Sequence, residues 1–413
     1  MKRYYLLGLC AIFGMAASLA SACDGGGDGA DSDSGTDSDT DADSDTDTDT
    51  EATYPAVAPS LPRVLTGGGP IIAAPKIVPI FFAADELQGS IESFLDALAA
   101  SSYWSDVTTE YGVGAPSIGE SIVVSTPAPA STTDDELATW LVTQTDGAHE
   151  GWPQADADTI FTLFYPATTA ISVHDKDSCS WWDGYHKEDT TTEAGTLVYA
   201  VLARCTPSLD DLTVATAHEL VAAATDPYYY TDPAYSFTDD AHFAWTMATV
   251  GEVNDLCLFE PGVDAQLVGD FVVPRSWSNE RADLGLDPCI PPVDGPYYGA
   301  QFASPEPVVM HVGSFSVATE GVHVGVGETK AIDIALYSDG PTDDIELQAF
   351  DESHYWGGTK QLDLALDPPS GKNGDVVHLT ITALEAGSYG GSLVFLKSTL
   401  GATGHVWLGF VEN

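Results

Sequence analysis

Residues 213–230 read TVATAHELVAAATDPYYY, and this stretch decides the fold. Its apolar, alanine-rich composition favours a helix that is buried on most sides. The Thr-Asp-Pro sequence near its end predicts a stop, because proline cannot continue a helix. His218 and Glu219 lie side by side within this apolar segment, where buried polar groups need a partner or a function. The stretch therefore predicts a buried helix that carries two ionisable side chains.

A helical His-Glu pair is part of the signature of zincin-type metallopeptidases, in which the histidine binds zinc and the glutamate is the general base. On this pattern His218 is a candidate metal ligand and Glu219 a candidate catalytic residue. The signature also needs a second ligand one turn later, and that position is Ala222. The alternative for His218 is a buried histidine that is satisfied by hydrogen bonds.

Any further metal ligands must come from elsewhere in the chain. Asp226 lies eight residues after His218, about 80° around an ideal helix, so it reaches the same region only if the helix end bends. An Asp before a Pro also commonly organises a turn. Glu252 and Asp255 lie in GEVNDLC, and His186 lies in GYH. Each of these is a candidate ligand, with zinc the expected metal, or alternatively a residue that shapes its loop.

Outward from this helix, residues 54–300 mix strands and helices. Three apolar runs predict buried strands, namely residues 75–82, 157–166 and 195–203. Apolar residues at helical spacing predict helices over residues 86–112 and 135–144. We expect Asp134 or Asp135 to cap the second helix. Strands that alternate with helices indicate an α/β or α+β domain, here of zincin-like type.

The pattern changes in residues 305–413. Apolar and polar residues alternate between Gly, Pro and Asn turns, and no helix is evident. About seven short strands in roughly a hundred residues predict an antiparallel β-sandwich of immunoglobulin-like type. This part holds no cysteine, so the inter-sheet disulfide of antibody domains is absent. We expect it to act in spacing or surface attachment.

The cysteines are consistent with export. Apart from Cys10 and Cys23 near the N-terminus, the chain has an even set of four, which suits an oxidising compartment. Four cysteines allow three pairings, and their order favours two disulfides on either side of the His-Glu helix. The favoured pairs are Cys179 with Cys205 and Cys257 with Cys289.

The N-terminus is typical of an exported lipoprotein. Two basic residues precede an apolar run, and small residues then lead to Cys23, which resembles the lipobox of bacterial lipoproteins. We interpret residues 1–22 as a lipoprotein signal peptide and Cys23 as the lipidation site, the alternative being ordinary signal cleavage near Ala22. Residues 23–53, rich in Asp, Ser and Thr, have nothing to bury and predict a disordered stalk. The expected location is the cell envelope, lipid-anchored to a bacterial membrane.

The charge of the chain excludes one class of partner. It has 63 acidic and 13 basic residues, a formal net charge of -50 at pH 7. Such a protein does not bind nucleic acid through phosphate neutralisation, and anionic lipid repels it. Membrane contact is therefore expected only through the N-terminal lipid. The expected partners are a peptide, a protein or a cell-surface polymer, and the oligomeric state does not follow from the sequence.

Several motifs occur in a fixed order between residues 64 and 292. They are GGGPIIAAPKIVPIFF, GYH after Cys179, AHELVAAATDP, GEVNDLC and RSWSNERA. This order resembles bacterial relatives of the plant phosphate-induced, or Exordium-like, proteins. The resemblance implies that the site is formed by His218, Glu219, Asp226, Glu252, Asp255 and the segment Trp277-Ser278-Asn279. The second glutamate of the family's helix falls on Ala222, which cannot bind a metal.

Three functions remain after these observations. The first is an extracytoplasmic lipoprotein whose residues 54–300 form an Exordium-like, metallopeptidase-like domain with zinc-dependent peptide hydrolysis. The second is a catalytically inactive peptidase-like domain that acts as a cell-surface binding or adhesion protein. The third is an envelope lipoprotein whose buried polar residues are only structural. Ala222 favours the second function, and the presence of both His218 and Glu219 favours the first.

Overall fold

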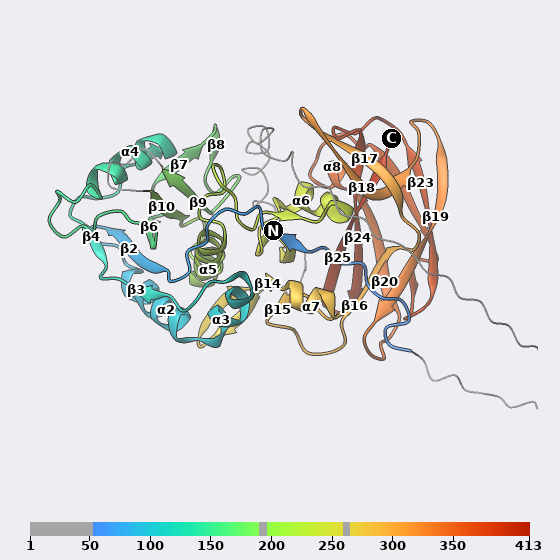
Figure 1. The fold of residues 1–413 in the computed structure, drawn as a ribbon, viewed down its shortest axis with the longest axis horizontal. Coiled ribbons are helices and arrows are strands. Elements are labelled where there is room, and N and C mark those ends of the chain that lie inside the picture. Colours follow the sequence, from blue (N-terminus) through green and yellow to red (C-terminus); the bar gives the residue numbers. More distant parts are fainter. Residues whose placement is uncertain (1–52, 190–195, 259–264) are drawn as a thin grey trace, which may run out of the picture.

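The computed structural model describes residues 53–189, 196–258 and 265–413. An α/β half, blue to green in Figure 1, lies beside a β-rich half coloured orange to red. The predicted signal peptide, Cys23 and the stalk up to residue 52 lie outside the described residues. Among the helices that the structure describes, none is long and apolar enough to cross a membrane.

A mixed sheet forms the centre of the first half. Its strands run in the order β3-β2-β6-β10-β9, with β4 also paired to β2. Strand β9 is antiparallel to β10, and the other pairs are parallel. The strands are β2 (Lys76–Phe82), β3 (Ser117–Ile118), β4 (Ile122–Val124), β6 (Thr159–Tyr165), β9 (Gly184–Asp189) and β10 (Leu197–Ala203). The three apolar runs predicted as strands are β2, β6 and β10, whose side chains are buried on both faces of the sheet.

Helices cover both faces of this sheet. Val198, Ala200 and Leu202 of β10 pack in one hydrophobic cluster with three helices, whereas Tyr199 and Val201 pack in a second cluster with the fourth. The first three helices are α2 (Gln88–Ala100), α3 (Ser102–Thr108) and α5 (Leu209–Thr225), and the fourth is α4 (Asp134–Gln144). The result is a three-layer α/β arrangement.

Two details of the predicted helices are corrected. The segment 86–112 is not one helix, because Ser101 is extended at φ -85° and ψ 156° and separates α2 from α3. The N-cap of α4 is Thr133, which forms a capping box with Glu136. Asp134 instead is buried and accepts hydrogen bonds from the Tyr185 and Tyr199 hydroxyls, at 2.7 and 2.8 Å.

Short elements connect the two halves. A small sheet holds β5 (Ser131–Thr133), β7 (Ala170–Val173) and β8 (Lys176–Asp177), and β1 (Val64–Leu65) pairs with β11 (Phe237–Thr238). Two further strand pairs follow α5, β12 (Ala265–Val268) with β13 (Phe271–Pro274) and β14 (Ser276–Trp277) with β15 (Cys289–Ile290). The short helices and turns among them are η3 (Asp240–His242), α6 (Phe243–Thr249), η4 (Asp255–Cys257) and α7 (Asn279–Asp283). The 3-10 turn η2 (Thr109–Tyr111) follows α3.

The second half is sheet-rich and is compatible with the predicted β-sandwich. One sheet has the order β16-β19-β23-β21 and the other β17-β18-β25-β24-β20-β22. The strands are β16 (Tyr298–Phe302), β17 (Glu306–Val312), β18 (Phe315–His323), β19 (Thr329–Ser338), β20 (Ile345–Asp351), β21 (Leu362–Asp367), β22 (Ser370–Gly371), β23 (Val376–Ala383), β24 (Gly391–Leu400) and β25 (Thr403–Glu412). Strand β16 joins this half although it lies before residue 305.

The sandwich departs from the prediction in two places. Strands β18 and β25 are parallel, with Val322 opposite Val411, whereas the other described pairs of this half are antiparallel. A short helix, α8 (Glu352–Tyr355), interrupts the segment where no helix was expected. Neither the direction of a strand pair nor a short helix between strands is specified by the alternating pattern.

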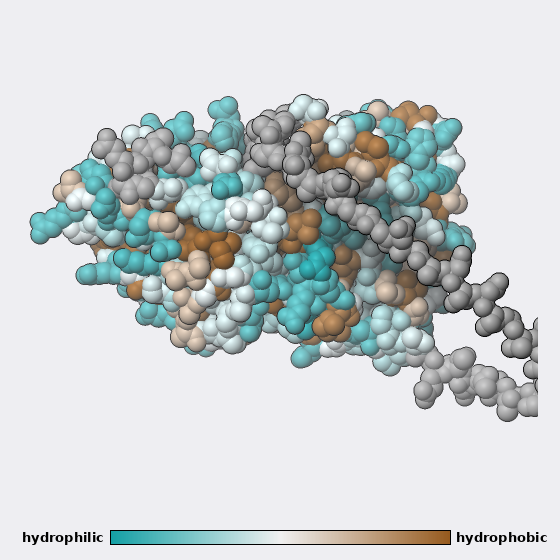
Figure 2. Space-filling view, viewed as in Figure 1, coloured by the Kyte–Doolittle hydropathy of each residue, from teal (hydrophilic) through white to brown (hydrophobic). Residues whose placement is uncertain are grey.

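The two halves share a hydrophobic interface. Phe243 and Met247 of α6 pack with Met310 and Phe410 of the sandwich. The Trp407 indole donates a hydrogen bond of 3.1 Å to the backbone oxygen of Ser60, so the N-terminal segment also runs along the sandwich. On the face seen in Figure 2, hydrophobic residues lie in separate patches among hydrophilic ones.

Both predicted disulfides are confirmed. Cys179 bonds Cys205 with a Cα to Cα distance of 4.9 Å, and Cys257 bonds Cys289 with 5.7 Å. The first joins the segment before β9 to the segment after β10. The second joins the turn after α6 to β15.

Candidate functional site

The predicted His-Glu helix is α5, and it is buried because nearly all its residues are apolar or small. Ser208 caps its start by accepting a hydrogen bond from the backbone N–H of Asp211, at 3.2 Å. The helix ends at Thr225, and the N–H of the C-cap residue Asp226 donates a hydrogen bond of 2.7 Å to the Ala222 carbonyl. Ala222 is fully buried. The position of the missing second ligand is therefore filled by close packing.

Glu219 meets His186 of strand β9. The His186 Nδ1 atom lies 3.5 Å from Glu219 Oε2, and both side chains are buried. Gly184, two residues before His186, leaves the space for Glu219, because a Cβ atom there would lie 2.8 Å from the Glu219 Cγ atom. Gly184 and Glu219 are far apart in the sequence, so no local pattern predicted this contact. An antiparallel edge strand thus supplies the imidazole that faces the candidate base.

The segment Glu252–Asp255, which leads into η4, adds two carboxylates. Asp255 Oδ1 lies 3.3 Å from His218 Nε2, and Glu252 Oε1 lies 3.4 Å from His186 Nε2. Asn254, between them, donates a hydrogen bond of 2.8 Å to the backbone oxygen of His218. This bond fixes the segment directly on α5.

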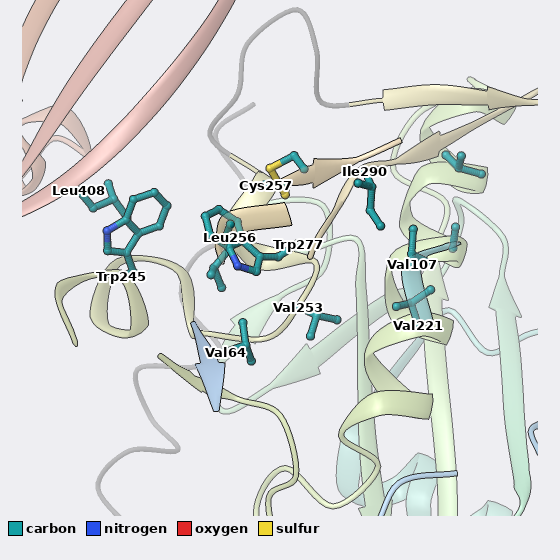
Figure 3. Close-up of a cluster of buried hydrophobic side chains, with 14 of the residues drawn as sticks. Val64, Val107, Val221, Trp245, Val253, Leu256, Cys257, Trp277, Ile290 and Leu408 are labelled. Atoms are coloured by element: carbon teal, nitrogen blue, oxygen red, sulfur yellow. A yellow bond between two sulfur atoms is a disulfide. The ribbon is translucent and has the colours of Figure 1, made fainter. Parts of the chain in front are cut away.

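The same segment is anchored from behind by apolar residues. Val253 and Leu256 alternate with the two carboxylates and are buried in a cluster with Trp245 and Trp277, whose rings are 5.6 Å apart. Figure 3 shows this cluster reaching from Val221 of α5 to Leu408 of the sandwich. The pattern of apolar and acidic residues therefore places Glu252 and Asp255 on the opposite side of the segment from its core.

These side chains enclose one small pocket of about 80 Å³. Its ionisable lining residues are His186, His218, Glu219, Glu252 and Asp255. The rest of its wall is Trp182, Gly184, Tyr185, Tyr229, Tyr230, Val250 and Leu258. Five of the six candidate site residues, drawn from three separate segments, therefore meet at one place.

The pocket strongly perturbs its titratable groups. Burial alone would lower the pKa of His186, but Glu252, Glu219 and Asp226 raise it to about 10. Burial likewise opposes the charged form of His218, and Asp255 raises its pKa to about 9. Burial raises the pKa of Glu252 to about 8, which His186 only partly offsets. Three carboxylates and two imidazoles thus share one buried site.

Asp226 does not line this pocket. Its Oδ1 atom accepts a hydrogen bond of 2.6 Å from the backbone N–H of Ala234, and burial raises its pKa to about 6. Its backbone oxygen accepts a hydrogen bond from His186 Nε2 at 3.1 Å. Asp226 thus closes the turn after α5 and orients His186 through its main chain.

The segment Trp277-Ser278-Asn279 also lies outside the pocket lining. The Asn279 side-chain amide accepts a hydrogen bond from the Val64 N–H and donates one to the Val64 carbonyl, each 2.8 Å long. Ser278 donates a hydrogen bond to Glu110 at 3.2 Å. These contacts support the fold around the site.

The expected zinc site is not preformed in the described parts of the chain. Within residues 53–189, 196–258 and 265–413, no group of three His, Cys, Asp or Glu side chains is arranged to hold a metal ion. Each imidazole faces a carboxylate instead. The aromatic wall was not predicted, although the runs SWWDGY and DPYYY flank the predicted ligands and signal it.

Comparisons with known proteins add little. No protein-family model matches the chain, and no curated protein matches it. Among solved structures, a chimeric titin Z1Z2 carrying an exogenous decorin peptide matches with 14% identity, over 28% of this chain and 92% of that chain, at a TM-score of 0.17. The titin M3 domain matches with 8% identity, over 28% and 97%, also at 0.17. The titin M4 domain matches with 10% identity, over 27% and 97%, at 0.15. At these TM-scores the likenesses carry no argument.

Proposed function

We propose that residues 54–300 form a zincin-like, zinc-dependent hydrolase of peptide bonds, carried by a lipid-anchored protein of the cell envelope. The observation that supports this most is the meeting of His186, His218, Glu219, Glu252 and Asp255 around one pocket. The resemblance to the Exordium-like order of motifs supports the assignment of these residues to one site.

The residues present fit a divalent cation. Glu252 Oε1 is buried and has no hydrogen-bond partner within the described chain. An orphaned carboxylate oxygen costs free energy unless a cation or donor meets it. Imidazole nitrogens with carboxylate oxygens are the ligands that zinc takes in hydrolases. His186, His218, Glu252 and Asp255 would hold the metal, which when bound supplies Lewis acidity and an acidified water.

The protein's own groups have distinct roles in this proposal. Glu219 accepts and returns the proton, since it lines the pocket and is the one lining carboxylate on the His-Glu helix. Asn254 holds the Glu252–Asp255 segment against α5, and the Asp226 carbonyl orients His186. Most of the lining side chains are buried, and a lower local dielectric strengthens the electrostatic interactions among them.

Two measurements test this function. Elemental mass spectrometry of the purified protein should find one zinc per chain, and His218→Ala should lose it. Glu219→Gln should retain the zinc and lose at least about 100-fold in peptide turnover, the scale of general base catalysis. His378→Ala, which changes an exposed histidine of the sandwich, is the matched control and should change neither value. Turnover that survives Glu219→Gln would refute the proposed mechanism.

A second candidate is an inactive peptidase-like domain that binds a peptide or surface polymer. Ala222 in the place of the second helical ligand favours it, as does the lack of a preformed metal group among the described side chains. Under this function the purified protein holds no zinc and Glu219→Gln leaves ligand binding intact.

A further inference from the structure

The charge of the pocket wall is one-sided. Glu219, Glu252 and Asp255 line it, and no Lys or Arg is among its described lining residues. Its only basic groups are two imidazoles, and each of these already faces a carboxylate. The two imidazoles are already engaged by these carboxylates, whose remaining oxygens would hold a further cation.

A second observation points to an unfilled place for a hydrogen-bond donor. The Glu252 side chain is only 10% exposed and lines the pocket, yet its Oε1 atom has no hydrogen-bond partner in the described structure. Its contact with His186 Nε2, at 3.4 Å, is an ion pair without hydrogen-bond geometry. An N–H donor that enters the pocket can satisfy this oxygen.

The rest of the wall also suits a cation. Trp182 and Tyr185 lie edge to face with their ring centroids 5.0 Å apart, and Tyr229 and Tyr230 form a similar pair at 5.1 Å. Aromatic faces carry partial negative charge and attract ammonium and guanidinium groups, with a gain of about 0.5–2 kcal/mol. A volume of about 80 Å³ suits one side chain or chain terminus rather than a folded partner.

Zinc held by Glu252 would occupy this oxygen, and the preference would then rest on the remaining charge and the aromatic wall. Two histidines bind zinc in their neutral form, so the divalent charge stands against three lining carboxylates. One negative charge then remains uncompensated. The aromatic wall and this residual charge act together on whatever enters next to the metal.

We propose that this pocket recognises a cationic group of a peptide, the ammonium of a lysine side chain or of a free amino terminus. The inference rests on the proposed function only in taking that peptide to be the substrate. A preference for cations would distinguish this site from a hydrolase pocket that selects apolar side chains.

The test is calorimetric binding to the purified full chain, with and without added zinc. The probes are Nα-acetyl-lysine methylamide against its uncharged analogue acetyl-norleucine methylamide, and leucine methylamide against acetyl-leucine methylamide. At least one cationic probe should bind about 10-fold or more tightly than its neutral partner. The first pair reports a side-chain ammonium and the second an amino terminus. Equal or weaker binding of both cations would overturn the inference.

Two variants make the test specific. Glu252→Gln should reduce the preference to less than about 3-fold. Asp363→Asn removes an equal charge from an exposed site of the sandwich and should leave it unchanged. If Glu252→Gln does not fold, Asp255→Asn takes its place, and a preference that survives the folded variant refutes the role of the pocket. Cation preference in a protein that binds no zinc would refute the hydrolase alone, whereas zinc-dependent hydrolysis without cation preference would refute this inference alone.

Discussion

The close approach of Gly184 to Glu219 makes a sharp prediction. In Gly184→Ala the new Cβ would lie 2.8 Å from Glu219 Cγ and 2.9 Å from Oε1, well inside ordinary contact. The strand conformation of Gly184 is open to alanine, since its φ is not positive. The clash is therefore with one side chain, and Glu219 must move.

The magnitude follows from two opposing terms. Overpacking a buried site costs about 1–3 kcal/mol. Replacing a glycine by alanine returns about 0.5–1 kcal/mol by restricting the unfolded chain. We expect Gly184→Ala to destabilise the protein by about 0–2.5 kcal/mol, and to lower turnover about 100-fold because the base is displaced.

A double-mutant cycle with Glu219→Ala isolates this contact. Without the Glu219 side chain there is no clash, so Gly184→Ala should now raise the melting temperature. The coupling between the two changes should be about 1–3 kcal/mol, measured by thermal unfolding of the four proteins in a chelator. Equal effects of Gly184→Ala in both backgrounds would refute the reasoning.

Three further predictions concern stability. Asn254→Ala should cost about 1–3 kcal/mol in thermal unfolding, because the part-buried carbonyl of His218 loses its side-chain donor. A variant as stable as wild type would contradict this. In a chelator, the free energy of unfolding should fall as pH rises from about 6 to 10. Folding raises the pKa of His186 to about 10 and that of Glu252 to about 8. The folded state therefore keeps these protons to a higher pH than the unfolded state does. Glu252→Gln should make this slope shallower, and an unchanged slope would show that Glu252 does not titrate there. Cys257→Ser breaks a disulfide that spans 32 residues, so it should destabilise the folded protein by about 3–4 kcal/mol. A loss of stability below about 1 kcal/mol would contradict the role of that crosslink.

Local patterns in the sequence predicted the elements that carry the site. The buried strands, the α5 helix and both cysteine pairs follow from apolar runs, an alanine-rich period and cysteine order. Strand β9 is different, because GYHKED has neither a continuous apolar run nor a clean alternation. Its place comes from pairing with β10, with His186 opposite Ala200, which is a long-range effect that local sequence does not encode.

The same limit applies within the site. His218, Glu219, Glu252 and Asp255 were identifiable from motifs, and so was His186. The sequence did not predict which of these groups face one another. The partner of each imidazole is set by how β9 and the Glu252–Asp255 segment pack on α5. Asp226 shows this limit most clearly, since its carboxylate turns away to the Ala234 N–H, as an Asp before a Pro often does.

The arrangement of the cluster in Figure 3 changes the expected role of the sandwich. Glu252 and Asp255 are held by Val253 and Leu256, which pack in a hydrophobic cluster that includes Leu408 of β25. The sandwich therefore supports the segment that supplies two of the three lining carboxylates. A domain that served only as a spacer would not need to share a core with the site. We expect Leu408→Ala, at about 2–5 kcal/mol for a buried leucine, to weaken the site as well as the sandwich. Zinc content and melting temperature measured together would detect this, and loss of sandwich stability with unchanged zinc affinity would restore the spacer role.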